Sequence, residues 1–155
     1  MKKLLLIALL IVGCEDNSTE SSYEDIIGNW VGSEINNEDL SINMNFSNTS
    51  LFYFSYINQD TLEAMEADYF VNQNYFPKQI DVFVKSSYIN QELQNSYTGL
   101  TSLGIYQIYS DTLTFAASEP GIIKRPINFE QGRNEDNDYY ARVFKLIRIE
   151  PNPIP

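Results

Sequence analysis

The stretch Leu40-Ser41-Ile42-Asn43-Met44-Asn45-Phe46 decides the fold of this chain, because apolar and polar side chains alternate along it without a break. Successive side chains of an extended strand point to opposite faces. One face therefore carries leucine, isoleucine, methionine and phenylalanine, while the other carries serine and asparagine. The pattern predicts a β-strand with one face buried and the other toward water.

Segments of similar character lie on both sides of this strand. Asparagine-rich turns occur at residues 36–37 and 48–49. The composition, with 11 Tyr and 9 Phe, favours strands over helices. Only residues 86–97 could accommodate a short helix. Besides residues 40–46, we expect strands at residues 30–35, 51–57, 65–71, 79–85, 103–109, 113–117 and 141–149.

Eight antiparallel strands joined by tight turns predict an all-β fold, an eight-stranded antiparallel up-and-down barrel. Closure into a barrel leaves no exposed strand edge. About 130 residues follow residue 25, enough for one core and too few for two. The interior of such a barrel is just wide enough to be filled by side chains or to hold one small ligand. A sandwich of two sheets is the alternative.

The N-terminus has the pattern of an export signal. Lys2 and Lys3 precede a short apolar run at residues 4–12, which is followed by Gly13 and the only cysteine, Cys14. This order predicts a lipoprotein signal peptide over residues 1–13, cut to leave an acylated Cys14. The apolar run is less than half of the roughly 20 residues that a membrane-spanning helix needs. We therefore expect a lipid-anchored protein of the cell envelope, in the outer membrane.

Residues 14–25 are predicted to be a flexible tether, because small, polar and acidic side chains dominate there and lysine and arginine are missing. Glu15 and Asp16 directly behind the cysteine resemble the signal that sends Bacteroidetes lipoproteins to the outer leaflet of the outer membrane. Surface display is one hypothesis and a periplasmic position is the other. The folded domain is then expected over residues 26–150, with a C-terminal tail at residues 151–155.

The charge of the chain limits its partners. The sequence has 21 acidic and 10 basic residues, a net charge of -11. Removal of Lys2 and Lys3 with the signal peptide makes the charge about -13. An excess of this sign argues against nucleic acid, whose phosphates are bound by lysine and arginine, and against docking onto an anionic membrane surface. Solubility is a sufficient reason for the negative charge.

Several short motifs then point to a family. Gly28-Asn29-Trp30, at the start of the first predicted strand, resembles the Gly-x-Trp signature of lipocalins. The further motifs are Pro77-Lys78-Gln79-Ile80-Asp81, Gly104-Ile105-Tyr106, Asp111-Thr112-Leu113, and Arg125-Pro126 with Phe129. In this order they resemble a lipocalin-like domain of uncharacterised function that is abundant in planctomycetes, over about residues 26–149. The resemblance implies the barrel and brings no established reaction.

The chain departs from the family pattern at one edge. Ile122 and Ile123 lengthen the segment ahead of Arg125, and the acidic loop at residues 130–138 is longer than the family usually carries. These differences affect the geometry of that edge and leave the prediction of a barrel unchanged.

Two arginines have expected structural roles. Trp30 is predicted to fill one end of the barrel, and lipocalins usually stack an arginine on that ring; Arg148 is the candidate, since first and last strands meet in a closed barrel. Stacking of Trp30 on a ligand is the alternative. Arg125, held by Pro126, is expected to pair with Asp81 or Asp111, with capture of an anion as the alternative. Asp111 also reads as a turn residue.

Catalysis has little support in the sequence. The chain has no histidine and its cysteine is expected to be acylated, so it lacks the triads of nucleophilic catalysis, a histidine-based zinc site and a phosphate-binding glycine loop. We expect no enzyme, no cofactor and no metal; residues 135–138 lack the ligand spacing of a calcium loop.

Residues 60–62 match a short motif for O-glycan attachment in Bacteroidetes.

Three classes of function stay open. The first is a binding module that holds a small apolar ligand in the barrel mouth, and it requires a cavity of at least a few hundred Å³. The aromatic residues expected to line or pack that site are Phe52, Phe54, Tyr56, Tyr69 and Phe83. The second is an interaction or enzyme-inhibitor module with a filled barrel, whose protein partner the sequence does not name. The third, an enzyme, would need a cleft with carboxylates of raised acidity.

Overall fold

The structure is a computed structural model that describes residues 25–57, 60–130 and 140–150, and for residues 60–62 it describes the backbone only. The described part of the chain is all-β. It contains no α-helix, and hence no helix that is long and apolar enough to cross a membrane. The expected signal peptide, Cys14, the tether up to residue 24 and the C-terminal tail lie outside the described residues.

All eight predicted strands are confirmed, and each begins and ends within a few residues of its expected limits. A ninth, two-residue strand follows β5. The strands are β1 (Gly28–Glu34), β2 (Asn37–Phe46), β3 (Ser50–Ile57), β4 (Asp60–Asn72), β5 (Lys78–Ile89), β6 (Glu92–Leu93), β7 (Thr101–Tyr109), β8 (Thr112–Ser118) and β9 (Ala141–Ile149).

The sheet closes on itself. Its strand order is β4-β3-β2-β1-β9-β8-β7-β5-β6, and β4 also pairs with β5. Every pairing is antiparallel. Strands that follow one another along the chain are therefore neighbours around an eight-stranded barrel, and β1 meets β9. This is the predicted up-and-down barrel, and it excludes the two-sheet sandwich.

The alternation of side chains along the strands creates the core. Leu40, Ile42, Met44 and Phe46 are all at most 4% exposed, as the pattern of residues 40–46 predicts. They point into the barrel and join the inward side chains of the other strands in one apolar cluster. A single interior core therefore holds the barrel together. Burial of apolar surface in this core contributes about 25 cal/mol per Å² to stability.

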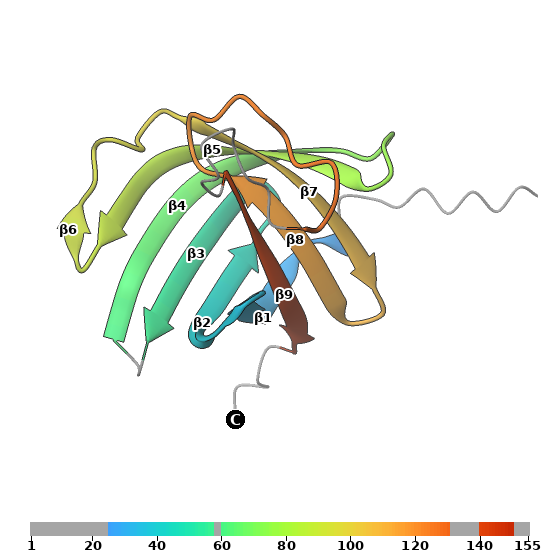
Figure 1. Ribbon diagram of the computed structural model, residues 1–155, viewed down its shortest axis with the longest axis horizontal. Helices are drawn as coiled ribbons and strands as arrows, with labels where there is room; N and C mark the ends of the chain where they lie inside the picture. The colour runs from blue at the N-terminus through green and yellow to red at the C-terminus, as the bar shows by residue number, and fades with distance from the viewer. Residues whose placement is uncertain (1–24, 58–59, 131–139, 151–155) are drawn as a thin grey trace, which may run out of the picture.

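The two ends of the barrel differ. β1, β3, β5 and β8 begin at one end, which we call the closed end, and they finish at the other, which we call the mouth. In Figure 1 the β4–β5 and β7–β8 connections of the closed end lie to the right, and β6 lies at the mouth to the left. The distinction matters because the mouth holds an apolar cavity.

The prediction of a possible helix at residues 86–97 is wrong. Residues 86–89 continue β5, and Glu92–Leu93 turn back to pair with its end. The reversal occurs at Asn90 and Gln91, which both have positive φ, 50° and 69°. Asparagine tolerates this left-handed conformation better than most residues, so the local sequence favours a hairpin over a helix.

A segment outside the barrel covers part of its wall. Between β8 and β9, residues 119–130 cross the outer face, and Phe129 packs on Ile105, Ala116 and Val143 in a second, small apolar cluster. These three residues face away from the core and are nevertheless at most 3% exposed. The covering segment contains Ile122 and Ile123 as well as Arg125 and Pro126.

Candidate binding site

The mouth of the barrel holds a cavity of about 150 Å³ that is open to solvent at one side. Its floor is apolar and is contributed by Met44, Leu51, Val82, Phe115 and Phe144. Ligand pockets usually measure roughly 300–1,000 Å³. This cavity is smaller, because the barrel's own side chains fill most of its interior. The cavity is smaller than the few hundred Å³ that a ligand of ordinary size requires, although about 150 Å³ of apolar space accommodates a molecule such as benzene.

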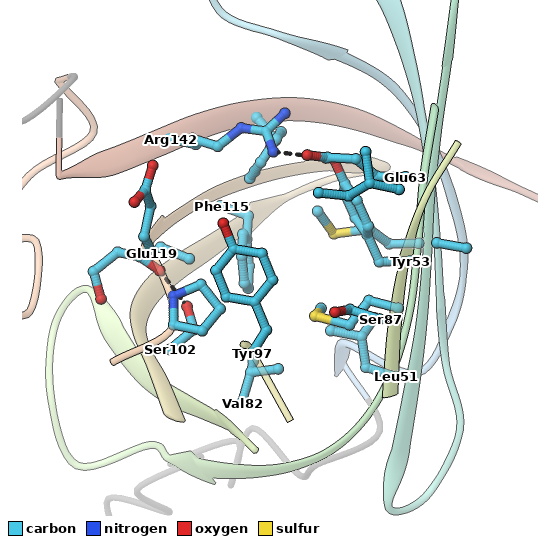
Figure 2. A pocket seen from close by; sticks show the side chains of 18 of the residues that line it. Leu51, Tyr53, Glu63, Val82, Ser87, Tyr97, Ser102, Phe115, Glu119 and Arg142 are labelled. Carbon is cyan, nitrogen blue, oxygen red and sulfur yellow. Dashed lines mark hydrogen bonds and ion pairs between the residues drawn. The ribbon is translucent and has the colours of Figure 1, made fainter. Parts of the chain in front are cut away.

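An arginine at the start of the last strand organises the charged side of the cavity. The Arg142 guanidinium donates from Nη1 to Glu63 Oε2 at 2.9 Å, and from Nη2 and Nε to Glu34 Oε2 at 3.0 and 3.2 Å. Arg142 also lies over the Phe144 ring, 5.2 Å from its centroid. One cation thus joins β9 to β1 and β4 across the mouth, as Figure 2 shows for its bond to Glu63.

The same carboxylate collects two hydroxyl groups from β3. Tyr53 Oη donates to Glu63 Oε2 at 3.1 Å and Ser55 Oγ donates to the same atom at 3.3 Å. Ser55 is fully buried and Tyr53 is 6% exposed. Buried hydroxyl groups need acceptors, and Glu63 supplies one for both, which fixes the carboxylate over the cavity.

Burial changes the ionisation of this network. Desolvation is the largest effect on Tyr53 and raises the pKa of its phenol to about 12; Arg142 works in the opposite direction and Glu63 in the same direction. For Arg142, burial lowers the pKa, but the electrostatic attraction of Tyr53, the hydrogen bond to Glu34 and the charges of Glu63 and Glu34 outweigh it, so the pKa is raised above its usual value. Tyr53 stays neutral and Arg142 stays charged at any physiological pH.

Small and aromatic side chains form the rim. Ser87, Ser102 and Ser118 are each at most 6% exposed, and all three donate to backbone carbonyl oxygens, Ser87 to that of Gln94 at 3.2 Å. Tyr97, from the segment between β6 and β7, extends its ring across the opening between Ser102 and Ser87 (Figure 2). Glu119 lines the side of the cavity opposite Glu63. The rim is therefore polar over an apolar floor.

The aromatic residues that we expected to line this site lie elsewhere. Phe52, Phe54 and Phe83 point outward and are 38%, 39% and 48% exposed, so the interpretation that they line the interior is wrong. Tyr56 is half-buried and does not line the cavity. Tyr69 points inward but belongs to the core near the closed end, where its hydroxyl donates to the Ser47 carbonyl oxygen. The inward face of β3 carries Leu51, Tyr53 and Ser55 instead.

The expected plug of the closed end is confirmed. Trp30 is fully buried, its Nε1 donates to the Ile26 carbonyl oxygen at 2.8 Å, and the Arg148 guanidinium lies 4.2 Å from the ring centroid. Arg148 also donates to the carbonyl oxygens of Ile27 and Asp25, at 2.6 Å each. Gly28 leaves the space for this arginine, because a Cβ there would lie 2.9 Å from Arg148 Nη1.

The second expected pair also forms. Arg125 Nη2 donates to Asp81 Oδ1, while Nη1 donates to the carbonyl oxygens of Ile80 and Gly104 at 2.9 and 2.6 Å. The arginine therefore holds the covering segment against β5 and β7. The prediction of a local ion pair for Arg125 is confirmed. Asp111 is not its partner, and the Asp111 carbonyl oxygen instead accepts from the Arg148 amide at 2.8 Å.

The remaining signature residues are structural. Tyr106 is fully buried, with Lys78 Nζ 5.8 Å from its ring centroid. Pro126 is buried beside Arg125. A Cβ on Gly104 would lie 2.9 Å from the Ala116 carbonyl oxygen, so glycine permits the close approach of β7 and β8 at this point.

Other predictions lie outside the described residues. They include acylation of Cys14 and the nature of residues 131–138 in the acidic loop. The side chains of the possible glycan motif at residues 60–62 are also outside the description.

Sequence reasoning missed the residues that carry the charge of the mouth, Arg142, Glu34, Glu63 and Glu119. A signal for two of them exists. Arg142 precedes Arg148 by an even number of residues on one strand, and Glu34 follows Trp30 likewise, so each pair shares a face. The expectation that Trp30 and Arg148 point inward therefore already places Arg142 and Glu34 inside the barrel, at its other end.

The arrangement is suited to binding. A half-buried cation shared by two carboxylates, beside an apolar recess, can orient a small molecule. Among the described residues no three His, Cys, Asp or Glu side chains come close enough together to hold a metal ion. Comparisons of the chain with known protein families, with curated proteins and with solved structures find no match.

Proposed function

We propose that this chain is a lipid-anchored lipoprotein of the cell envelope, with a lipocalin-like domain that acts as a non-catalytic binding module for a small, largely apolar molecule. The observation that carries the binding role is the open cavity at the mouth, with an apolar floor and a polar rim. The pattern Lys2-Lys3, apolar run, Gly13-Cys14 supports the anchor. The barrel with its Trp30–Arg148 plug supports the resemblance to the lipocalin-like domain.

The size of the cavity restricts the ligand. About 150 Å³ holds a single ring or a short branched chain. A longer molecule can insert only one end, because the cavity is open on one side and the core beneath it is filled. The proposed ligand is therefore smaller than we expected from the sequence alone.

A variant that fills the cavity tests this proposal. Ala117 lines the cavity from the inward face of β8, so Ala117→Phe occupies the space, while Thr114→Phe on the outward face of the same strand is the matched control. A ligand at a hundredfold excess over its Kd stabilises a protein by about 2.7 kcal/mol. Small apolar molecules should raise the Tm of the natural protein and of Thr114→Phe but not that of Ala117→Phe. Equal shifts in all three proteins would refute the site.

Mass spectrometry of the natively purified protein tests the anchor and the ligand together. We expect diacylglycerol on Cys14 and a small co-purifying molecule that Ala117→Phe lacks. A Cys14→Ser variant should leave the membrane fraction. Its retention there would contradict the anchor and leave the cavity unaffected.

A second function is favoured by the outer face of the sheet. Phe52 and Phe54 on β3 and Phe83 on β5, the two strands that flank β4, expose 38–48% of their surface, and exposed aromatic residues are typical of protein interfaces. The domain is then an envelope interaction or enzyme-inhibitor module. A photo-crosslinking residue at position 54 should then capture one defined partner in intact cells, whereas one at exposed position 145 on β9, three strands away, should not. Identical products at both positions would exclude this function.

A further inference from the structure

Among the described residues, the charges around the cavity do not balance. Arg142 is the only cation among the described residues that line it, and two carboxylates already share that cation, those of Glu34 and Glu63. The side chains of Glu34, Arg142 and Glu63 are 12%, 30% and 32% exposed, so the trio is partly withdrawn from water. It carries one negative charge in excess, and charge in a partly buried place is costly unless it has a partner.

In the described part of the chain, the second oxygen of Glu63, which lines the cavity, takes no part in this network. The hydrogen bonds that Glu34 and Glu63 accept there all end on Oε2, three of them on that of Glu63. Glu119 adds a further negative charge on the opposite side of the cavity (Figure 2). A group held between Glu63 and Glu119 thus faces carboxylates on two sides.

Aromatic rings complete the surroundings. Tyr97 stands in the opening, Tyr53 lies in the wall, and Phe115 and Phe144 lie in the floor. Ring faces attract cations by about 0.5–2 kcal/mol, depending on exposure. Because an apolar recess and aromatic rings adjoin the carboxylates, the site fits an organic cation better than a metal ion, for which the described residues offer no set of three ligands.

We propose that the ligand of this cavity is a small organic ammonium compound, with an apolar body about the size of a benzene ring in the recess and its positive group between Glu63 and Glu119. This inference rests on the proposed binding function and adds the sign of the ligand's charge. It also predicts that carboxylic acids of the same shape are rejected, although an arginine is present, because two glutamates already neutralise that arginine.

Three probes of one shape test the proposal on the full-length chain: benzylamine, which is cationic at neutral pH, benzyl alcohol, which is neutral, and benzoate, which is anionic. Calorimetric titration or ligand-observed NMR gives the three Kd values. We expect benzylamine to bind about tenfold more tightly than benzyl alcohol, and benzoate to bind most weakly. The preference should shrink as salt is added, because screening weakens exposed charge interactions.

Two charge-neutralising variants locate the effect. Glu119→Gln and Glu63→Gln keep the shape of the side chain and should each reduce the preference for benzylamine over benzyl alcohol about threefold to tenfold. Glu150→Gln is the matched control, since it removes the same charge from the residue directly after β9, at the closed end. It should change neither Kd.

The outcomes separate the two levels of the proposal. Benzyl alcohol or benzoate binding as tightly as benzylamine would overturn the cationic ligand and leave the binding function standing. No binding of any of the three probes, even at millimolar concentration, would overturn both. A benzylamine affinity that responds equally to Glu119→Gln and Glu150→Gln would show a diffuse effect of net charge and would also refute the site.

Discussion

Each end of the barrel places an arginine against an aromatic ring, and the partners of the two arginines differ. At the closed end, Arg148 lies on fully buried Trp30 and donates to the carbonyl oxygens of Ile27 and Asp25. At the mouth, Arg142 lies on Phe144 and donates to Glu34 and Glu63 beside a cavity. Neutral carbonyl partners complete a solid plug, whereas carboxylate partners beside empty space create a charged site. The closed end therefore stabilises the fold, and the mouth is available for function.

The largest expected effect is at the closed end. Trp30→Ala removes a fully buried indole on which Arg148 rests, and such changes usually cost about 3–5 kcal/mol of unfolding free energy. Urea denaturation of the variant should show this loss, while Tyr97→Ala at the mouth should change stability by less than about 1 kcal/mol. Equal losses at both ends would remove the distinction between plug and site.

The next largest effect is a pH dependence of the folding stability, caused by Tyr53 at the mouth. Because the pKa of Tyr53 is raised to about 12 in the folded protein, its neutral form contributes stability that is fully present below pH 10. That contribution is lost as the pH rises toward 12, a loss on the order of 2–3 kcal/mol. Stability measured at pH 9 to 12 should fall less in Tyr53→Phe than in the natural protein. Parallel curves for the two proteins would contradict the burial of this phenol.

A smaller effect should come from Arg142→Met. The change leaves Glu34 and Glu63 facing each other without their cation, at a cost of about 1–3 kcal/mol given their partial exposure. Adding Glu63→Gln to this variant should recover part of the loss, which a double-mutant cycle measures. Strict additivity of the two substitutions would show that the two residues do not interact.

The smallest effect sharpens the description of the plug. Gly28 has a φ of 136°, and a Cβ there would meet Arg148 Nη1 at 2.9 Å. Gly28→Ala should therefore cost about 1 kcal/mol or slightly more, through backbone strain and displacement of the arginine. Combining Gly28→Ala with Arg148→Ala should reduce the added cost. A Gly28→Ala protein as stable as the natural one would show that the arginine moves aside freely.

Much of the fold could be predicted from the sequence because the signals are local. The alternation in residues 40–46 and the turns between strands identify all eight strands of the barrel, and even the pairing of β1 with β9 follows from closure. The contacts of Trp30 with Arg148 and of Asp81 with Arg125 could also be predicted. Each of these residues belongs to a short motif whose place in the barrel is known, so the topology of the barrel brings the partners together.

The lining of the site could not be predicted in the same way, because β3 has bulky side chains on both faces. Phe52 and Phe54 alternate with Leu51 and Tyr53, so size alone does not tell which face is inside. The hairpin register decides it: Phe46 of β2, which points inward, pairs with Leu51. Residues paired across a hairpin share a face, and this places Leu51 and Tyr53 in the interior and the two phenylalanines outside.

The central claim is that the mouth, and not the closed end or the outer face, holds a ligand. Methyl and aromatic NMR spectra of the full-length chain during titration with benzylamine test it most directly. We predict shifts at Met44, Leu51, Val82 and Ala117 around the cavity, with the indole signal of Trp30 unchanged. Shifts that centre on Trp30 or on the exposed rings of Phe52, Phe54 and Phe83, or spectra without any shift, would contradict the account.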